Sequence, residues 1–388
     1  MNFITHLNDK QNEFLAYVAT VILYIVATIR LPSENIRAMF ILIFTSAIIF
    51  LIGILIIKFI NIWVGLFLLL SYWSTIYPTY AWETNYTAKL LIEYLRLSSF
   101  LNIFLAVLWF VFIVIFIKKT QFEKIFNAFC IISLMTVVLL ILQKLNFDPI
   151  YYIKGMEARN SDTIGFLSCR NEVAAFLTIC FPAFLRKKWI WTIPLIFIGI
   201  ILSKSFLSIF TIAISVSFYF ICLNPYLGIE IIFIGITCIL IYYFKIDKPS
   251  VFERWKLWKV ILDIFSQHKI FGCGIGIYQL IMQRIENINK ELYKLVIKAD
   301  GRVWWRWACN EFLQGYVEIG IGFIICVGGY LINSIFKFKK ENILYYTALL
   351  AIIISSCCTY VFHNPINALF AVTWLGLLEI KSKENYNV

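Results

Sequence analysis

The sequence is a succession of long apolar runs with one extended polar interruption, at residues 245–310. A helix needs roughly 20 apolar residues to cross the hydrocarbon core of a membrane, and most of the runs approach that length. Hydrophobic residues make up 61% of the 388 residues and charged residues 14%, against about 45 to 50% and about 25% in soluble domains. We therefore expect an all-α polytopic membrane protein in which residues 1–388 form a single transmembrane domain.

Twelve apolar runs are candidates for transmembrane helices. They cover residues 14–30, 38–57, 60–77, 98–117, 124–143, 166–185, 189–203, 205–222, 226–244, 311–333, 343–361 and 365–380. Short cytoplasmic loops carry an excess of Lys and Arg, and the distribution of these residues places both termini in the cytoplasm. The external side then receives residues 144–165, Lys204, the segment 245–310 and His363.

The basic residues and the Cys and His residues argue against two kinds of function. The net charge of +12 does not indicate nucleic-acid binding, because the basic residues flank apolar runs, where they contact the headgroups of membrane lipids. Ten Cys and three His residues show no spacing typical of a metal site. We therefore expect no nucleic acid, no metal and no other cofactor.

The segment 245–310 is expected to be a large external, periplasmic loop that contains amphipathic helices and is inserted between the ninth and tenth spans. A first helix is predicted at about residues 250–266. A second is predicted at residues 281–295, where apolar residues recur at spacings of three and four and charged residues fill the gaps. Such a helix lies on a membrane surface or on the helix bundle.

Two cations on the external side are candidates for binding an anionic substrate. Arg254 opens the first loop helix, and a guanidinium group matches two phosphate oxygens with a planar fork of donors. Lys204 stands between Ser203 and Ser205, where two apolar runs meet, and a charge there is costly unless it snorkels or pairs. A headgroup anchor or an ion pair is the alternative for Arg254, and snorkelling is the alternative for Lys204.

Three closely spaced glycines, Gly272, Gly274 and Gly276, follow within the same loop. Glycine permits positive φ, and successive backbone amides in such a turn can hold an anion. No strand and helix of a dinucleotide-binding fold surround these glycines, so a plain turn is the alternative.

Polar residues open two of the predicted spans on the external side. The triplet Arg170-Asn171-Glu172 opens the sixth span, and Asn310-Glu311 opens the tenth, with Gln314 one turn further on. A carboxylate at a helix N-terminus caps the helix or, with its pKa raised in a low dielectric, acts as a general base. His363 lies at the external end of a late span and is a candidate base or ligand-orienting donor, with a plain loop residue as the alternative.

In their order along the chain, these features resemble the O-antigen ligase and O-antigen polymerase superfamily, integral membrane enzymes of bacterial surface polysaccharide assembly. The resemblance covers about residues 160–380. Its matching pieces are Gly165 to Pro182 through Asn171, Ser203-Lys204-Ser205, Arg254 with Trp258, Gly272 to Gly276, and Cys309-Asn310-Glu311-Phe312-Leu313-Gln314 followed by Glu318 and Gly320.

The resemblance implies a glycosyltransferase of the bacterial inner membrane whose active side faces the periplasm. Such enzymes move a glycan from an undecaprenyl-diphosphate-linked donor to a hydroxyl of a glycan or lipid A core acceptor, without a nucleotide donor. The implied catalytic residues are Arg254, Cys309, Glu311 and His363. Those implied for diphosphate binding are Arg170, Lys204, Arg254, Gly272, Gly274 and Gly276, and those implied as supporting residues are Asn171, Glu172, Asn310 and Gln314.

Two positions depart from the family pattern. Lys204 stands where Arg is usual, and it offers a point charge without the bidentate fork. Cys309 stands where a catalytic His is frequent, and a thiol with a reference pKa of about 8.5 is a poor substitute for imidazole. Glu311 or His363 is therefore expected to act as the base, unless the diphosphate leaving group needs little assistance.

Two other functions are compatible with the sequence. A transporter or flippase for lipid-linked or anionic solutes would show polar residues within spans and inverted repeats, whereas charges are scarce in the centres of these runs and no pair of broken helices recurs in the two halves. A family member without catalytic activity would account for Lys204 and Cys309. The order of the motifs favours the glycosyltransferase.

Overall fold

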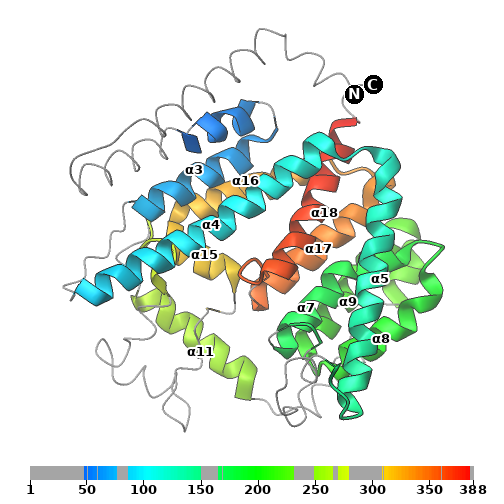
Figure 1. The fold of residues 1–388 in the computed structure, drawn as a ribbon. Helices are drawn as coiled ribbons and strands as arrows, with labels where there is room; N and C mark the ends of the chain where they lie inside the picture. Colours follow the sequence, from blue (N-terminus) through cyan, green and yellow to red (C-terminus); the bar gives the residue numbers. More distant parts are fainter. Residues whose placement is uncertain are drawn as a thin grey trace. The chain divides into compact units, whose positions relative to one another are not determined.

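The computed structural model describes residues 48–49, 51–58, 60–76, 86–149, 165–167, 169–230, 249–264, 270–278, 308, 310–359 and 361–384. Within these residues every regular element is a helix, as expected (Figure 1). The predicted span at 14–30, the predicted loop helix at 281–295 and Cys309 lie outside the described residues. The chain divides into two compact units, Met1–Ile52 and Gly53–Val388, and all helices named below belong to the second.

The described helices follow the predicted apolar runs closely in most places. In chain order they are α3 (Ile62–Ile76), α4 (Tyr86–Phe116), α5 (Lys119–Lys144), α7 (Arg170–Cys180), α8 (Ile193–Leu202), α9 (Phe206–Leu223), α11 (Pro249–Ile264), α15 (Glu311–Ile319), α16 (Ile321–Phe336), α17 (Ile343–Cys358) and α18 (Pro365–Glu384). Short 3-10 helices lie at Phe181–Leu185, Ile190–Thr192 and Lys340–Asn342. The helix predicted at 250–266 is confirmed as α11.

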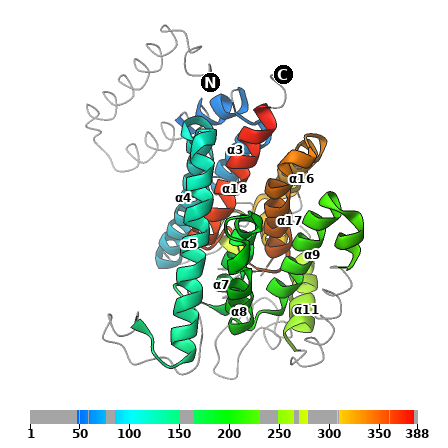
Figure 2. The same ribbon diagram turned by 90° about the vertical axis from the view of Figure 1, so that its right-hand side faces the viewer.

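Helices distant in sequence pack along one another. α18 lies against α4, α17 against α9, α5 against α8, and α16 against α3 (Figures 1 and 2). α7 contacts both α17 and α18. The C-terminal helices α15 to α18 therefore contact helices from the first half of the chain.

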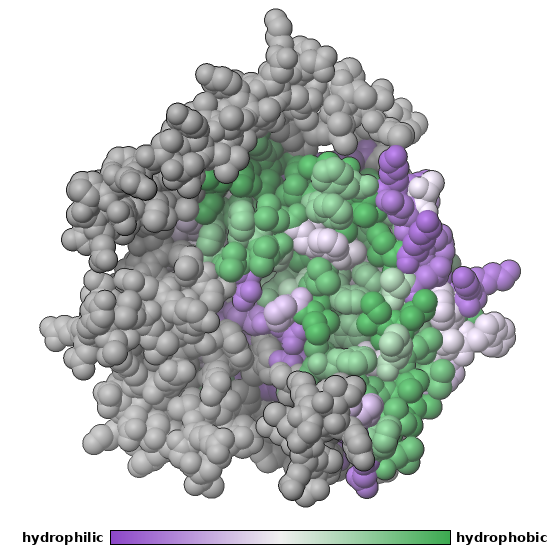
Figure 3. Space-filling model, viewed as in Figure 1, coloured by the Kyte–Doolittle hydropathy of each residue, from purple (hydrophilic) through white to green (hydrophobic). Residues whose placement is uncertain are grey.

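Among the described residues, two helices are long and apolar enough to cross a membrane: the part of α4 from Ser99 to Phe116, and α5. Large hydrophobic side chains on both helices are exposed, among them Phe112 of α4 and Met135 and Val138 of α5. Figure 3 shows a broad hydrophobic surface on this side of the molecule. Such a surface is unusual for a soluble monomer, so it supports association with a membrane. The twelve spans, the external loop and the orientation stay predictions.

An aromatic core holds α5, α7, α17 and α18 together. Trp374 of α18 is buried and stacks on Phe126 of α5, with ring centroids 5.1 Å apart. Its indole nitrogen donates to the carbonyl of Ile179 in α7 at 2.9 Å. Tyr345 of α17 meets the same indole edge to face, with centroids 6.1 Å apart. This core fixes α7 against α18, and both helices begin near the candidate site.

The tenth predicted span, residues 311–333, is not one continuous helix, because α15 ends at Ile319 and α16 begins at Ile321. Gly320 separates them with a φ of 85°, a conformation that glycine adopts without steric cost. A Cβ at this position would stand 2.2 Å from the carbonyl oxygen of Ile270. Hydropathy registers neither constraint, so the break could not be predicted from the apolar run.

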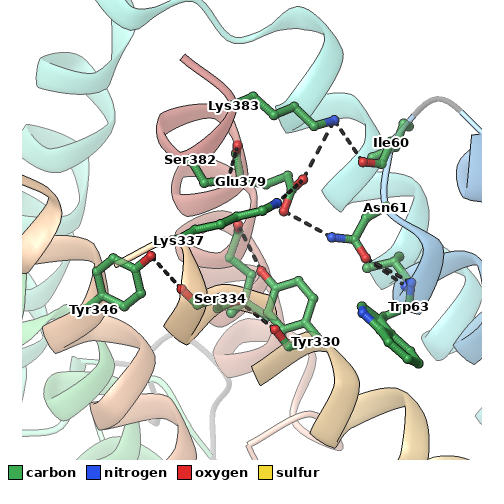
Figure 4. Close-up of polar contacts among 12 residues, drawn as sticks. Ile60, Asn61, Trp63, Tyr330, Ser334, Lys337, Tyr346, Glu379, Ser382 and Lys383 are labelled. Carbon is green, nitrogen blue, oxygen red and sulfur yellow. Dashed lines mark hydrogen bonds and ion pairs between the residues drawn. The ribbon is translucent and has the colours of Figure 1, made fainter. Parts of the chain in front are cut away.

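A polar network around the buried Glu379 carboxylate joins the start of α3, the end of α16 and the C-terminal end of α18 (Figure 4). The Glu379 carboxylate accepts from Asn61 Nδ2 at 3.1 Å and lies 3.9 Å from Lys337 Nζ and 3.7 Å from Lys383 Nζ. Lys383 also donates to the carbonyl of Ile60 at 2.8 Å. The network therefore connects three helices that line the cavity described below.

Candidate functional site

α15 brings the first candidate residues together at its N-terminus. Asn310 caps the helix, because its side chain accepts from the backbone N–H of Leu313 at 3.0 Å. The carboxylate of Glu311 is buried and turns instead to the loop before α18. One of its oxygens accepts from the backbone N–H of Phe362 at 2.7 Å and from that of His363 at 3.2 Å. The capping role that was the alternative for Glu311 thus belongs to Asn310.

The second oxygen of Glu311 pairs with the imidazole of His363. Glu311 Oε2 lies 2.8 Å from His363 Nδ1. Together with the two backbone contacts, this bond fixes the loop of His363 on the start of α15. The two residues expected to supply the base therefore form one unit.

The surroundings of His363 shift its pKa in two opposite directions. Removal of the ring from water lowers the pKa, whereas the charge and the hydrogen bond of Glu311 raise it, and the charge of Glu318 raises it further. The net result is a pKa raised above the ordinary value of 6.5. A base works best when its pKa lies near the working pH, so an upward shift suits proton transfer near neutrality.

Gln314, one turn after Glu311, contacts the other nitrogen of the imidazole. Its Nε2 lies 2.9 Å from His363 Nε2 and 3.2 Å from a carboxylate oxygen of Glu318. Its Oε1 accepts from the backbone N–H of Ala308 at 3.2 Å. Glu311, Gln314 and Glu318 follow one another at spacings of three and four, so they share one face of α15.

The glycine turn packs against the C-terminal end of α15. Its glycines all have positive φ, of 69° at Gly272, 111° at Gly274 and 74° at Gly276. The N–H groups of Cys273 and Gly274 donate to the carbonyls of Val317 and Glu318 at 2.8 and 3.0 Å. Gly276 forms a backbone hydrogen bond with the Glu318 side chain. The turn therefore contacts a carboxylate of the chain itself, and its part in diphosphate binding stays a prediction.

Arg254 lies on α11, the helix within the segment 245–310. α11, which carries Arg254 half-buried, contacts α15. One turn further on, the indole nitrogen of Trp258 donates to the carbonyl of Ala308 at 2.9 Å. A chain of hydrogen bonds thus leads from α11 through Ala308 to Gln314 and His363.

The other predicted cations lie on different elements. Lys204 is exposed in the turn between α8 and α9 and has a φ of 53°, which is uncommon for a residue other than glycine. Arg170 and Asn171 open α7, and the carbonyl of Glu172 accepts from Asn367 Nδ2 at 3.1 Å, which connects the start of α7 to the start of α18. None of these residues lines the cavity beside Glu311.

A cavity of about 270 Å³ adjoins the polar group on α15. Glu311, Glu318 and His363 line it, and most of its other lining residues are apolar side chains of α3, α4, α16, α17 and α18. Within the described part of the chain, no Lys or Arg lines this cavity. The arrangement offers carboxylates and an imidazole to a ligand that is otherwise surrounded by hydrocarbon.

Sequence reasoning missed the contribution of α3 and α4 to the cavity. Trp63 and Phe67 of α3 and Asn102 of α4 line it, and only Asn102 had a signal, as a polar residue inside an apolar run. Among the described residues, no group of three or more His, Cys, Asp and Glu side chains is placed to hold a metal ion.

Comparisons of the sequence with models of known protein families and with curated proteins found no match. The pairing of Glu311 with His363 beside an apolar cavity is therefore the main structural indication of what the protein does.

Proposed function

We propose that the protein is a membrane glycosyltransferase of the O-antigen ligase or polymerase type. It transfers a glycan from an undecaprenyl-diphosphate-linked donor to a hydroxyl of a glycan or lipid A core acceptor, at the periplasmic face of the bacterial inner membrane. One observation supports this most directly: a carboxylate and imidazole pair, Glu311 and His363, lines a largely apolar cavity. A lipid-linked glycan carries hydrocarbon, which suits the apolar walls, and hydroxyl groups, which suit the polar pair.

The pair is arranged to accept a proton. With the Nδ1–H donated to Glu311, Nε2 is the basic nitrogen of His363, and a carboxylate in this position orients the ring and stabilises the imidazolium that forms. During transfer, the acceptor oxygen forms a bond to the anomeric carbon and its proton passes to the pair. The bond between that carbon and the diphosphate oxygen breaks, and undecaprenyl diphosphate leaves with the electron pair.

The charges around the site favour different places for the two substrates. Glu311 and Glu318 line the cavity, and carboxylates repel a diphosphate at close range. We therefore assign the diphosphate to Arg254 on α11, with Lys204 and Arg170 as further cations. The acceptor hydroxyl then approaches from the side of the carboxylates, and the apolar walls hold hydrocarbon.

The test is glycan transfer by the purified full-length protein in liposomes that contain an undecaprenyl-diphosphate-linked glycan and an acceptor. Glu311→Gln and His363→Gln should each lower the rate about 100-fold or more, the usual contribution of a general base. Arg254→Ala should abolish transfer while the protein stays in the membrane. Glu341→Gln, at an exposed position between α16 and α17, is the matched control and should transfer at the wild-type rate.

Two results would contradict the proposal. Retained transfer in Arg254→Ala would remove the diphosphate role of that residue. Wild-type rates in both Glu311→Gln and His363→Gln would show that the pair takes no part in the chemistry. A wild-type protein that binds the donor but transfers nothing would instead support the inactive family member.

A transporter is the second candidate, because the break at Gly320 interrupts a predicted span. In transporters, free carbonyls at such breaks coordinate ions. Here the carbonyl of Glu318 accepts from Ser74 Oγ at 2.6 Å and from the N–H of Gly274 at 3.0 Å, and the N–H of Gly320 donates to the carbonyl of Tyr316 at 2.8 Å. These carbonyls are already satisfied, so the break favours a structural role. Movement of labelled donor across liposomes without glycan transfer would favour the transporter.

A further inference from the structure

The carboxamide of Gln314 has one orientation that suits all of its partners. The backbone N–H of Ala308 can only donate, so the Gln314 atom 3.2 Å away must be the oxygen. The amide nitrogen then faces His363 Nε2 at 2.9 Å and a carboxylate oxygen of Glu318 at 3.2 Å. Both hydrogens of the amide are thereby donated.

This orientation determines the tautomer of the imidazole. Because Gln314 donates to Nε2 of His363, that nitrogen must accept, so the ring proton lies on Nδ1 and is donated to Glu311 at 2.8 Å. A proton on Nε2 would bring two donors face to face. The network is consistent only with a neutral ring protonated at Nδ1.

The group that orients Gln314 is itself held from outside α15. Ala308 is buried, and its carbonyl accepts from Trp258 Nε1 at 2.9 Å. Trp258 lies on α11, one turn from Arg254. The position of α11 is therefore transmitted to the imidazole through three hydrogen bonds, from Trp258 to Ala308, from Ala308 to Gln314 and from Gln314 to His363.

We propose that Gln314 is a positioning residue that keeps Nε2 of His363 unprotonated, and that α11 sets this state through Trp258 and Ala308. The amide occupies Nε2 in the empty site and is displaced when an acceptor hydroxyl arrives. The proposal rests on the proposed function only for this use of Nε2 as the base. The tautomer and its dependence on Gln314 do not require glycan transfer.

The charges near the ring favour its protonated form, whereas the hydrogen bond from Gln314 favours its neutral form. Glu311 and Glu318, both from α15, favour the protonated imidazole. α3 and α17 carry no charged residue within their bounds, and the charged residues of α18 lie at the end distant from His363. α7 brings Arg170 and Glu172 to the start of α18. Removal of the Gln314 donor should therefore raise the proton affinity of the ring. If the substitution only loosened the packing of the site, water would enter and the pKa of His363 would return towards its ordinary value.

NMR of the full-length protein labelled with [15N]histidine, in lipid nanodiscs, reports the tautomer and the titration of the ring. The chain has three His residues, and His363→Gln identifies the signal of His363 by its loss. In the wild type we expect Nε2 unprotonated and Nδ1 protonated above the titration midpoint. Gln314→Met should raise the midpoint, and Gln314→Glu, an acceptor in place of a donor, should raise it by about one unit or more, a gain of tenfold or greater in proton affinity.

The matched control is Gln143→Met, which changes a buried glutamine bonded to Gly165 and should leave the His363 midpoint unchanged. A wild-type ring protonated at Nε2 would overturn the proposal, whether or not the variants fold. A midpoint that falls or stays constant in both Gln314 variants would also overturn it, because that result is expected of a residue that only fills space. If the protein does not transfer glycans, the transfer assay will show it, and the NMR results on the tautomer and the titration midpoint of His363 will remain valid.

Discussion

At the scale of single residues, the Glu311 carboxylate collects three N–H groups from the loop before α18. They are the backbone N–H of Phe362, the backbone N–H of His363 and the imidazole Nδ1–H. Hydrogen bonds to an ionised acceptor are stronger than those between neutral groups. The loop is therefore attached to α15 largely through the charge of Glu311, and this attachment depends on the protonation of Glu311 and His363.

We expect the stability of the fold to depend on the protonation of His363. The pKa of His363 is raised in the folded chain, so the folded state binds the proton more tightly than the unfolded chain does. This contribution is fully present below the ordinary pKa of about 6.5 and is lost as the pH rises through the folded pKa. The apparent thermal unfolding midpoint in detergent should therefore fall as the pH rises from below 6.5 through the raised pKa of His363.

His363→Gln provides the control for this pH dependence. The variant lacks the titrating ring, so its thermal unfolding midpoint should fall less with rising pH than that of the wild type. An equal fall in the wild type and the variant would assign the pH dependence to other groups.

At the scale of elements, the break between α15 and α16 depends on one glycine. Gly320→Ala would place a Cβ 2.2 Å from the carbonyl oxygen of Ile270 at a φ of 85°, and a backbone held in such a region costs about 1–3 kcal/mol. We expect a lower free energy of unfolding, measured in denaturant, and a loss of transfer, because Glu318, two residues before Gly320, lines the cavity.

Gly328→Ala is the matched control for this substitution. Nothing lies within 4 Å of a Cβ at Gly328 in α16, and Ala favours a helix over Gly by about 1 kcal/mol. Its free energy of unfolding should stay the same or rise. Equal destabilisation by both substitutions would show that the conformation at Gly320 is not the cause.

Elements bounded by polar residues were predictable, and elements shaped by backbone geometry were not. α3 and α9 follow their apolar runs, because the hydropathy falls where each helix ends. α4 begins at Tyr86, well before the predicted start at residue 98, because Lys89 and Arg96 interrupt the apolar pattern without interrupting the helix. The break at Gly320 depends on a backbone from elsewhere in the chain, which no local pattern contains.

At the scale of the whole molecule, the Glu379 network should contribute to stability by joining α3, α16 and α18. Glu379→Gln keeps a hydrogen bond to Asn61 but leaves Lys337 and Lys383 without their counter-charge. We expect a loss of about 1–3 kcal/mol in the free energy of unfolding, less than for a fully enclosed pair, because water reaches Lys383. Glu341→Gln serves as the exposed control, and equal stability of the two variants would contradict the role of the network.

The candidate site could be predicted by its members but not by its geometry. Glu311 and His363 stood out as a carboxylate and an imidazole at the ends of apolar runs, yet no spacing indicates that residues this far apart in sequence touch. The cavity depends on α3 and α4, whose apolar residues face it only in the folded chain. The role of Gln314 depends on the amide of Ala308, and side-chain chemistry alone does not reveal it.

The glycine turn and the helix break touch backbone to backbone. A Cβ on Gly272 would stand 2.3 Å from the carbonyl oxygen of Glu318, and a Cβ on Gly320 would stand 2.7 Å from the nitrogen of Gly272. Neither glycine can gain a side chain without displacing the backbone of the other segment, so we expect the two glycines to be retained together. Their joint presence is a sharper criterion for finding distant relatives than the apolar runs, which any membrane protein can supply.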